Sequence, residues 1–128
     1  MNKLLRALVM SAAVLVGAAC ASSSGAGRKP AADPVTVEVS NQNRRDVRVY
    51  VVRGGTSVRL GTVVSGRTAT FTYRGMSAGQ SETLHLNAEI IGGDAKFTSA
   101  GVRVAPGERV ALRVEDLIQS SSISVRRP

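Results

Sequence analysis

Apolar and polar residues alternate at every second position along much of this chain, which is the period of a β-strand with one buried face. The pattern is clearest at residues 35–40 and 82–91, and it recurs in short runs as far as Val125. Turns rich in glycine separate the runs, and no segment has the 3.6-residue period of an amphipathic helix of ordinary length. The sequence therefore predicts an all-β domain over residues 34–128.

Seven or eight short strands fit between residues 34 and 128 of the 128-residue chain. Short strands with frequent turns in so small a domain favour an antiparallel sandwich of two sheets, with a small open barrel as the alternative. This pattern resembles the immunoglobulin and fibronectin type III class of bacterial envelope modules. The chain has one cysteine and no tryptophan, so it lacks the cysteine pair and core tryptophan of true immunoglobulin domains.

Two turns, at residues 54–55 and 65–66, predict how three consecutive strands pair, because glycine tolerates the positive φ of a tight hairpin. The pairs that the two turns imply are Val51 with Val58, Val49 with Leu60, Val47 with Thr62, Val58 with Tyr73, Leu60 with Phe71 and Thr62 with Ala69. Both turns place Val58 and Leu60 on one face. We therefore expect a three-stranded antiparallel meander with these two side chains in the core.

The first twenty residues have the organisation of an export signal. A short basic start at residues 2–6 precedes an apolar stretch at residues 7–16, and small residues follow up to Cys20. The apolar stretch is shorter than the roughly 20 residues that a membrane-spanning helix needs. We therefore expect a signal helix that is cleaved.

Cys20 is the only cysteine of the chain, so it cannot form an internal disulfide. Its surroundings resemble the lipobox of bacterial lipoproteins, in which small residues precede a cysteine that receives a diacylglycerol and becomes the first residue of the mature chain. Ala18 and Ala19 match the small residues, whereas Gly17 departs from the leucine usual at that position. The resemblance implies that Cys20 is lipidated and that residues 1–19 are removed.

Residues 21–33 are rich in serine, glycine, alanine and proline, which is typical of a flexible linker. The expected organisation is a signal peptide at 1–19, a lipidated cysteine and linker at 20–33, and the β-sandwich at 34–128. The lipoprotein resemblance implies attachment to a cell-envelope membrane, and the absence of Asp at position 21 suits the periplasmic face of the outer membrane. The alternative is cleavage after Ala21, which would release a soluble periplasmic accessory or chaperone-like domain.

The chain is strongly basic, with 17 Lys and Arg against 9 Asp and Glu, a net charge of +8. In the predicted register Arg48, Tyr50, Arg59 and Thr72 share the outward face of the meander, where Tyr50 can stack on Arg59. Such a face suits phosphate or carboxylate groups of an anionic envelope component, such as lipid head groups or lipopolysaccharide, or of an acidic protein. A solvated face in an arginine-rich composition explains the same pattern without any ligand. The export signal argues against nucleic acid as the partner.

Two patterns point weakly to catalysis. Ser77 lies in a G-x-S-x-G sequence like the nucleophile elbow of α/β-hydrolases, but a strand is predicted after it where that motif needs a helix. His85, Asn87 and Glu89 share the polar face of one strand, which a solvated sheet face explains without a metal. We therefore expect no catalytic residue, metal or cofactor, and a non-catalytic binding or structural module. A small hydrolase or metal-dependent enzyme using Ser77 or His85 is the alternative.

Overall fold

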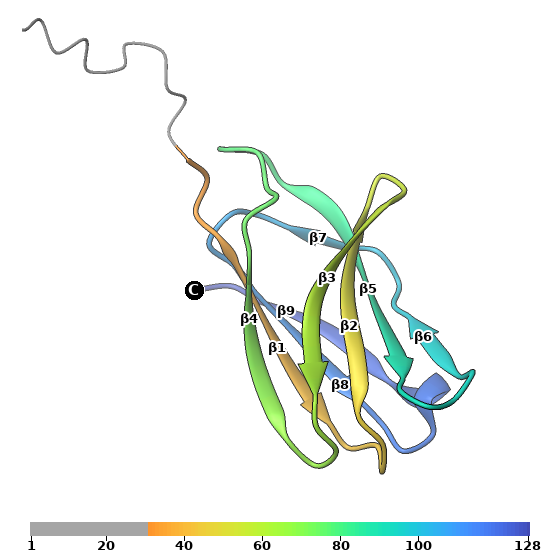
Figure 1. Ribbon diagram of the computed structural model, residues 1–128. Helices are drawn as coiled ribbons and strands as arrows, with labels where there is room; N and C mark the ends of the chain where they lie inside the picture. The colour runs from red at the N-terminus through yellow and green to blue at the C-terminus, as the bar shows by residue number, and fades with distance from the viewer. Residues whose placement is uncertain (1–30) are drawn as a thin grey trace, which may run out of the picture.

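The computed structural model describes residues 31–128, which form two β-sheets packed face to face (Figure 1). Cys20, the expected signal peptide and most of the expected linker lie outside the described residues. The elements in chain order are β1 (Val35–Asn41), β2 (Val47–Arg53), β3 (Thr56–Val63), β4 (Thr68–Tyr73), β5 (Glu82–Ile90), β6 (Lys96–Thr98), β7 (Val102–Val104), β8 (Arg109–Val114), the 3₁₀ turn η1 (Ile118–Ser120) and β9 (Ser122–Arg126). The predicted all-β sandwich is confirmed.

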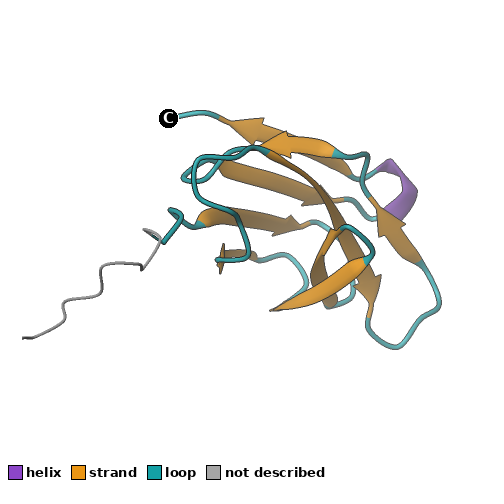
Figure 2. Cartoon of the chain, turned by 90° about the horizontal axis from the view of Figure 1, so that it is seen from above, coloured by secondary structure: helices purple, strands orange, loops and turns teal. Residues whose placement is uncertain are grey.

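One sheet has the strand order β4-β1-β8-β9 and the other the order β3-β2-β5-β6, with β7 beside the opposite end of β5 (Figure 1). Figure 2 shows the strands of the sandwich from above. The pair β1–β8 is parallel, and the other paired strands of the described chain are antiparallel. In this strand order β3 and β4 are edge strands of different sheets, and they lie on the same side of the sandwich. No helix in this part of the chain is long and apolar enough to cross a membrane.

The core confirms the period-two pattern, because the inner strands of both sheets turn every second side chain inward. The core residues of β1, β2, β5 and β8, each at most 1% exposed, are Val35, Val37, Val39, Val47, Val49, Val51, Leu84, Leu86, Ala88, Val110, Leu112 and Val114. Burying one valine or leucine side chain stabilises the fold by about 1.5–3 kcal/mol. This layer of apolar residues is the main source of stability.

The hairpin β2–β3 has the predicted turn but not the whole predicted register. Val51 lies opposite Val58, as predicted. A β-bulge then shifts the register, so that Gly61 rather than Leu60 lies opposite Val49, and Val63 rather than Thr62 lies opposite Val47. The extra residue turns Val63 into the core, where it is 1% exposed, and leaves the polar Thr62 outside.

The predicted three-stranded meander is wrong, because β4 pairs with β1 of the other sheet and not with β3. The turn at residues 65–66 does form, and the Arg67 N–H donates to the Val64 carbonyl as in a hairpin (3.0 Å). The Arg67 carbonyl, however, accepts the N–H of Asn41 at the end of β1 (2.8 Å). The chain thereby crosses to the second sheet, and Val58 loses the cover of β4 and is 42% exposed.

This topology predicts unequal effects for two valines that face each other in the hairpin. Val51→Ala is expected to lower the free energy of unfolding by about 2 kcal/mol, because Val51 is fully buried. Val58→Ala is expected to cost less than about 1 kcal/mol, because its side chain already contacts water. Urea denaturation measures both. Equal losses would indicate the meander that the turns alone suggest.

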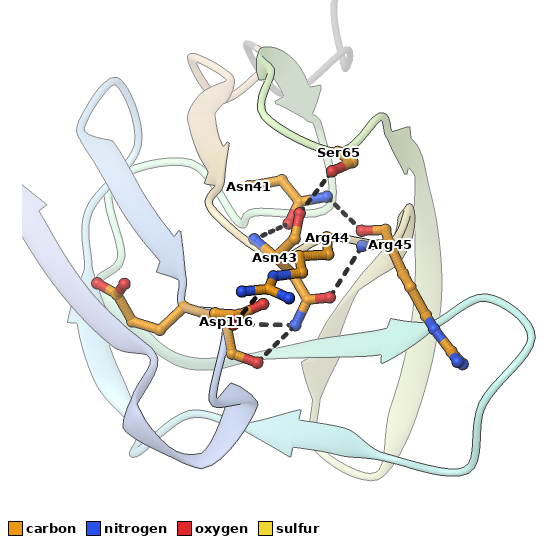
Figure 3. A network of polar contacts seen from close by, with 7 residues as sticks. Asn41, Asn43, Arg44, Arg45, Ser65 and Asp116 are labelled. Atoms are coloured by element: carbon orange, nitrogen blue, oxygen red, sulfur yellow. Dashed lines mark hydrogen bonds and ion pairs between the residues drawn. The ribbon is translucent and has the colours of Figure 1, made fainter.

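A polar network ties together the loops at the end of the sandwich opposite the first described residues (Figure 3). Its centre is Asn43, only 5% exposed, whose Nδ2 donates to the carbonyls of Glu115 (3.1 Å) and Asp116 (3.0 Å). Its Oδ1 accepts the N–H of Arg45 (3.0 Å), and its own N–H donates to Asn41 Oδ1 (2.9 Å). The β1–β2 loop is thus joined to the loop after β8.

The same network reaches the connection between β3 and β4. The fully buried Asn41 donates from Nδ2 to the carbonyls of Arg45 (2.9 Å) and Val63 (3.0 Å). Ser65 donates from its hydroxyl to the Asn43 carbonyl (2.7 Å). These bonds satisfy backbone groups that the crossing between sheets leaves without ladder partners.

Candidate functional site

The three residues predicted for anion binding lie on the outer face of the sheet β3-β2-β5-β6. Tyr50 on β2 lies directly opposite Arg59 on β3, so the structure brings this pair together. Arg48 lies opposite Thr62 on one side and Glu89 on the other. Thr72, predicted for the same face, lies on β4 in the other sheet, because β4 does not pair with β3.

The outer face becomes more balanced in charge towards β5 and β6. Glu89 lies between Arg48 on β2 and Lys96 on β6 in the ladder, and Asn87 lies between Tyr50 and Thr98. The excess of positive charge is therefore not spread over the whole face. It is concentrated at the β3 edge.

A groove of about 510 Å³ lies between the edge strands β3 and β4. Its lining residues are Arg53, Thr56, Val58, Arg59 and Leu60 from the β2–β3 hairpin, and Thr72, Tyr73, Arg74 and Gly75 from β4 and the residues after it. Three arginines thus surround an apolar surface. The groove exists because the two sheets part at this edge instead of being joined by a meander.

Beside the groove, towards the β3–β4 loop, the aromatic ring of Phe71 on β4 lies against the backbone of β3. A Cβ atom on Gly61 would lie 2.6 Å from Cε1 of Phe71, so only glycine lets this ring lie against the β3 backbone. Towards the other end the apolar surface is less covered, since Val58 is exposed and Leu60 is half-buried. We call the opening lined by Arg53, Val58, Arg59, Leu60, Tyr73 and Arg74 the arginine groove.

The three arginines of the groove differ in how far they are neutralised. Arg53 Nη1 forms an ion pair with Glu82 Oε2 (2.7 Å) and also donates to the Gly75 carbonyl. Arg59 donates to the Thr62 hydroxyl (3.3 Å). Within residues 31–128, neither Arg59 nor Arg74 forms an ion pair. Two guanidinium groups are therefore available to a carboxylate or phosphate.

Glu82 holds the edge of the groove in place. Partial burial alone would raise the pKa of its carboxyl, but hydrogen bonding with Ser77 and the charge of Arg53 outweigh it and lower the pKa below the ordinary 4.5. Glu82 is therefore ionised at neutral pH and keeps Arg53 in position. Its charge is directed at Arg53, and Arg59 and Arg74 have no such partner among the described residues.

Ser77 and His85 are not brought together by any hydrogen bond of the described chain. Ser77 lies in the loop between β4 and β5, where it contacts Glu82, and a strand follows this loop. His85 Nδ1 lies 3.0 Å from the Ser99 carbonyl. Each residue therefore has a local structural partner.

The face that carries His85, Asn87 and Glu89 lies on β5, with the three side chains half-buried. Among residues 31–128, no three His, Cys, Asp or Glu side chains are close enough together to hold a metal ion. Asn87 donates to the Thr98 hydroxyl (3.3 Å), and its Oδ1 is buried without a hydrogen-bond partner.

A scan against protein-family models found no match, and a search of curated proteins found none either. Among solved structures, the chain is similar to an NMR structure of a protein from Eubacterium rectale, with 19% sequence identity and a TM-score of 0.48. The similarity covers 80% of this chain and 95% of that chain.

The sequence analysis identified Arg59 as a site residue but did not single out Arg53 or Arg74. The three share one groove only because β4 lies in the sheet opposite β3. No local pattern encodes this placement. The exposure of Val58 is a sign of the groove, but this exposure itself results from the crossing of β4 to the other sheet and is not visible in the sequence.

Proposed function

We propose that this protein is a lipid-anchored, non-catalytic binding module of the bacterial cell envelope, which binds an anionic partner at the arginine groove. Lipidated Cys20 would hold the chain in the membrane, on the periplasmic side of the outer membrane, and residues 21–30 would link it to the sandwich. The observation that carries the binding role is the groove itself, in which Arg59 and Arg74 lie beside an apolar surface without acidic partners among the described residues.

The chemistry of the groove favours a ligand that is both anionic and partly apolar. Guanidinium groups bind carboxylate and phosphate with paired hydrogen bonds. Val58 and Leu60 offer an apolar contact that a free inorganic anion would not use. A macromolecule that presents acidic groups beside apolar ones matches both properties.

The groove lies near the point where the linker enters the domain. Ala31 and Ala32 line a second hollow together with Arg74 and Met76, and Ala32 packs partly on the core. An anchored domain would therefore hold the arginine groove at its membrane-proximal end. A partner in or near the membrane would meet the groove at high effective concentration.

The proposal predicts salt-sensitive binding by residues 31–128, which contain both sheets and the described core. The two probes are a peptide of ten glutamates and vesicles of phosphatidylglycerol, with phosphatidylcholine vesicles as the neutral comparison. Reversing two arginine charges with Arg59→Glu and Arg74→Glu is expected to weaken binding to the anionic probe at least about tenfold, since each arginine near an anionic surface contributes about 1 kcal/mol.

The matched control reverses two arginines on the other side of the sandwich, with Arg103→Glu and Arg126→Glu. Both are exposed and form no ion pair within the described chain, so the change in net charge is the same. Binding of this control should stay within about twofold of the unaltered protein at 0.15 M salt, where charges act over about 8 Å. Failure of both anionic probes to bind, or equal losses in the two variants, would contradict the groove as the binding site.

A further inference from the structure

The edge strand β4 lacks the features by which proteins usually protect a sheet edge. Natural edges are blunted by charges, proline, bulges or very short strands. Residues Thr68–Tyr73 contain no charged residue, proline or glycine, and they pair with β1 in regular register over the whole strand. The alternation of threonine with Ala69, Phe71 and Tyr73 strongly favours an extended strand.

The other edges of the described sheets are protected. The bulge in β3 interrupts its edge and Arg59 lies beside it, while β6 and β7 have only three residues each and carry Lys96 and Arg103. β9 ends in Arg126 and lies beside β7. Among these edges β4 alone is both regular and uncharged.

The hydrogen-bonding groups of β4 face away from its neighbour at alternate positions. Thr36 on β1 donates its N–H to the Glu108 carbonyl (3.1 Å), towards β8 and away from β4. Its ladder partner Thr72 therefore turns its N–H and carbonyl to the open edge, and Thr70 and Thr68 do the same because the pattern repeats every two residues. These groups can pair with a further strand.

The charges at the ends of β4 indicate which strand would fit. Exposed Arg67 and Arg74 flank the strand, seven positions apart, and neither guanidinium has an ion pair or hydrogen bond within the described chain. In an antiparallel pair of two copies that joins the outward groups, Thr70 lies opposite Thr70, and each end brings Arg67 of one copy within one position of Arg74 of the other. The linker of this chain, with Arg28 and Lys29, carries the same sign of charge. A strand with an acidic residue at each end has the complementary charge.

From this geometry we propose that β4 binds an extended segment of another protein as an additional strand, with an acidic residue near Arg67 and another near Arg74. The inference rests on the proposed function, because Arg74 also lines the arginine groove. Inward side chains of the added strand would cover the half-buried Phe71 and Leu60, which β4 and β3 leave partly open. The partner is thus an acidic protein segment rather than a lipid surface.

The test uses the full-length protein in a non-ionic detergent and two labelled eight-residue peptides with blocked termini. Both have alternating threonine and valine at positions 2–7. One has Asp at positions 1 and 8, and the other has Lys there. Fluorescence anisotropy is expected to show at least about tenfold tighter binding of the Asp peptide, since two matched charge pairs replace two repulsive ones. Hydrogen exchange should show new protection of the Thr68, Thr70 and Thr72 amides.

Two variants separate strand addition from general attraction of charge. Thr70→Pro removes an outward N–H without removing a bond to β1, and it should weaken binding of the Asp peptide about five- to tenfold. Thr70→Val keeps that N–H and should change binding less than about twofold. Arg67→Glu with Arg74→Glu should reverse the preference in favour of the Lys peptide, which keeps the test decisive even if the proline variant fails to fold.

The outcomes distinguish this inference from the proposed function. If neither peptide binds while ten glutamates or phosphatidylglycerol vesicles still bind through Arg59 and Arg74, strand addition is wrong and the anion-binding role stands. If no anionic probe binds, both strand addition at β4 and anion binding at the arginine groove are wrong. Protection of the β4 amides that rises with protein concentration without peptide would show self-pairing and also overturn the inference.

Discussion

Leu86→Ala is expected to lower the free energy of unfolding by about 2–5 kcal/mol, the range for a leucine removed from a close-packed core. Leu86 is 1% exposed and lies on β5, opposite Val51 of β2, where both sheets bury their inward side chains. The midpoint temperature of thermal unfolding should fall by roughly 10–30 °C, because each kcal/mol of lost stability shifts the midpoint of so small a domain by about 4–8 °C.

Leu117→Ala is the matched control for this substitution. Leu117 is 65% exposed and precedes η1, so the same change of side chain should alter the unfolding free energy by no more than about 0.5 kcal/mol. A similar loss for the two leucines would mean that the described core does not account for the stability of the domain.

Asn43→Ala is expected to destabilise the domain by about 2–4 kcal/mol although it removes little apolar surface. The substitution leaves the carbonyls of Glu115 and Asp116 and the N–H of Arg45 without their partner. A buried polar group that loses its hydrogen bond costs about 1–3 kcal/mol, and neighbouring bonds in a network support each other. Urea denaturation and the thermal midpoint both measure this loss.

Asn87→Ala provides the comparison for the same chemical change. Asn87 has one side-chain hydrogen bond, to Thr98 at 3.3 Å, and its Oδ1 has no partner. We expect a change of less than about 0.5 kcal/mol, since almost no hydrogen bonding is lost. If Asn43→Ala were as mild as Asn87→Ala, the polar network would not be what holds the three loops together.

The strands of this fold could be predicted from sequence because their signal is local. Val35, Val37 and Val39 alternate with polar residues and are all fully buried, as the period of two requires. The pairing of β4 could not be predicted in the same way. The turn at residues 65–66 makes the first hairpin bond, but the chain then enters the other sheet, where the Arg67 carbonyl accepts the N–H of Asn41, 26 positions earlier in the sequence.

The candidate site was predicted only in part for the same reason. The contact of Tyr50 with the Arg59 position follows from a two-residue turn nearby in sequence. Arg59 and Arg74 line the same groove only because the two sheets lie beside each other at this edge. The bulge that shifts the register of β3 buries Val63 instead of Thr62, which also depends on packing across the sandwich. Long-range packing therefore creates the groove, and local pattern does not reveal it.

Intact mass spectrometry of the mature protein tests whether a lipid on Cys20 holds the proposed binding module in the envelope. We expect a chain that begins at Cys20, with a mass raised by covalently bound diacylglycerol. Cys20→Ala is expected to remove the added mass and to release the protein from the membrane fraction. A mature chain that begins at Ser22 without lipid would instead indicate a soluble periplasmic protein and rule out the proposed anchor.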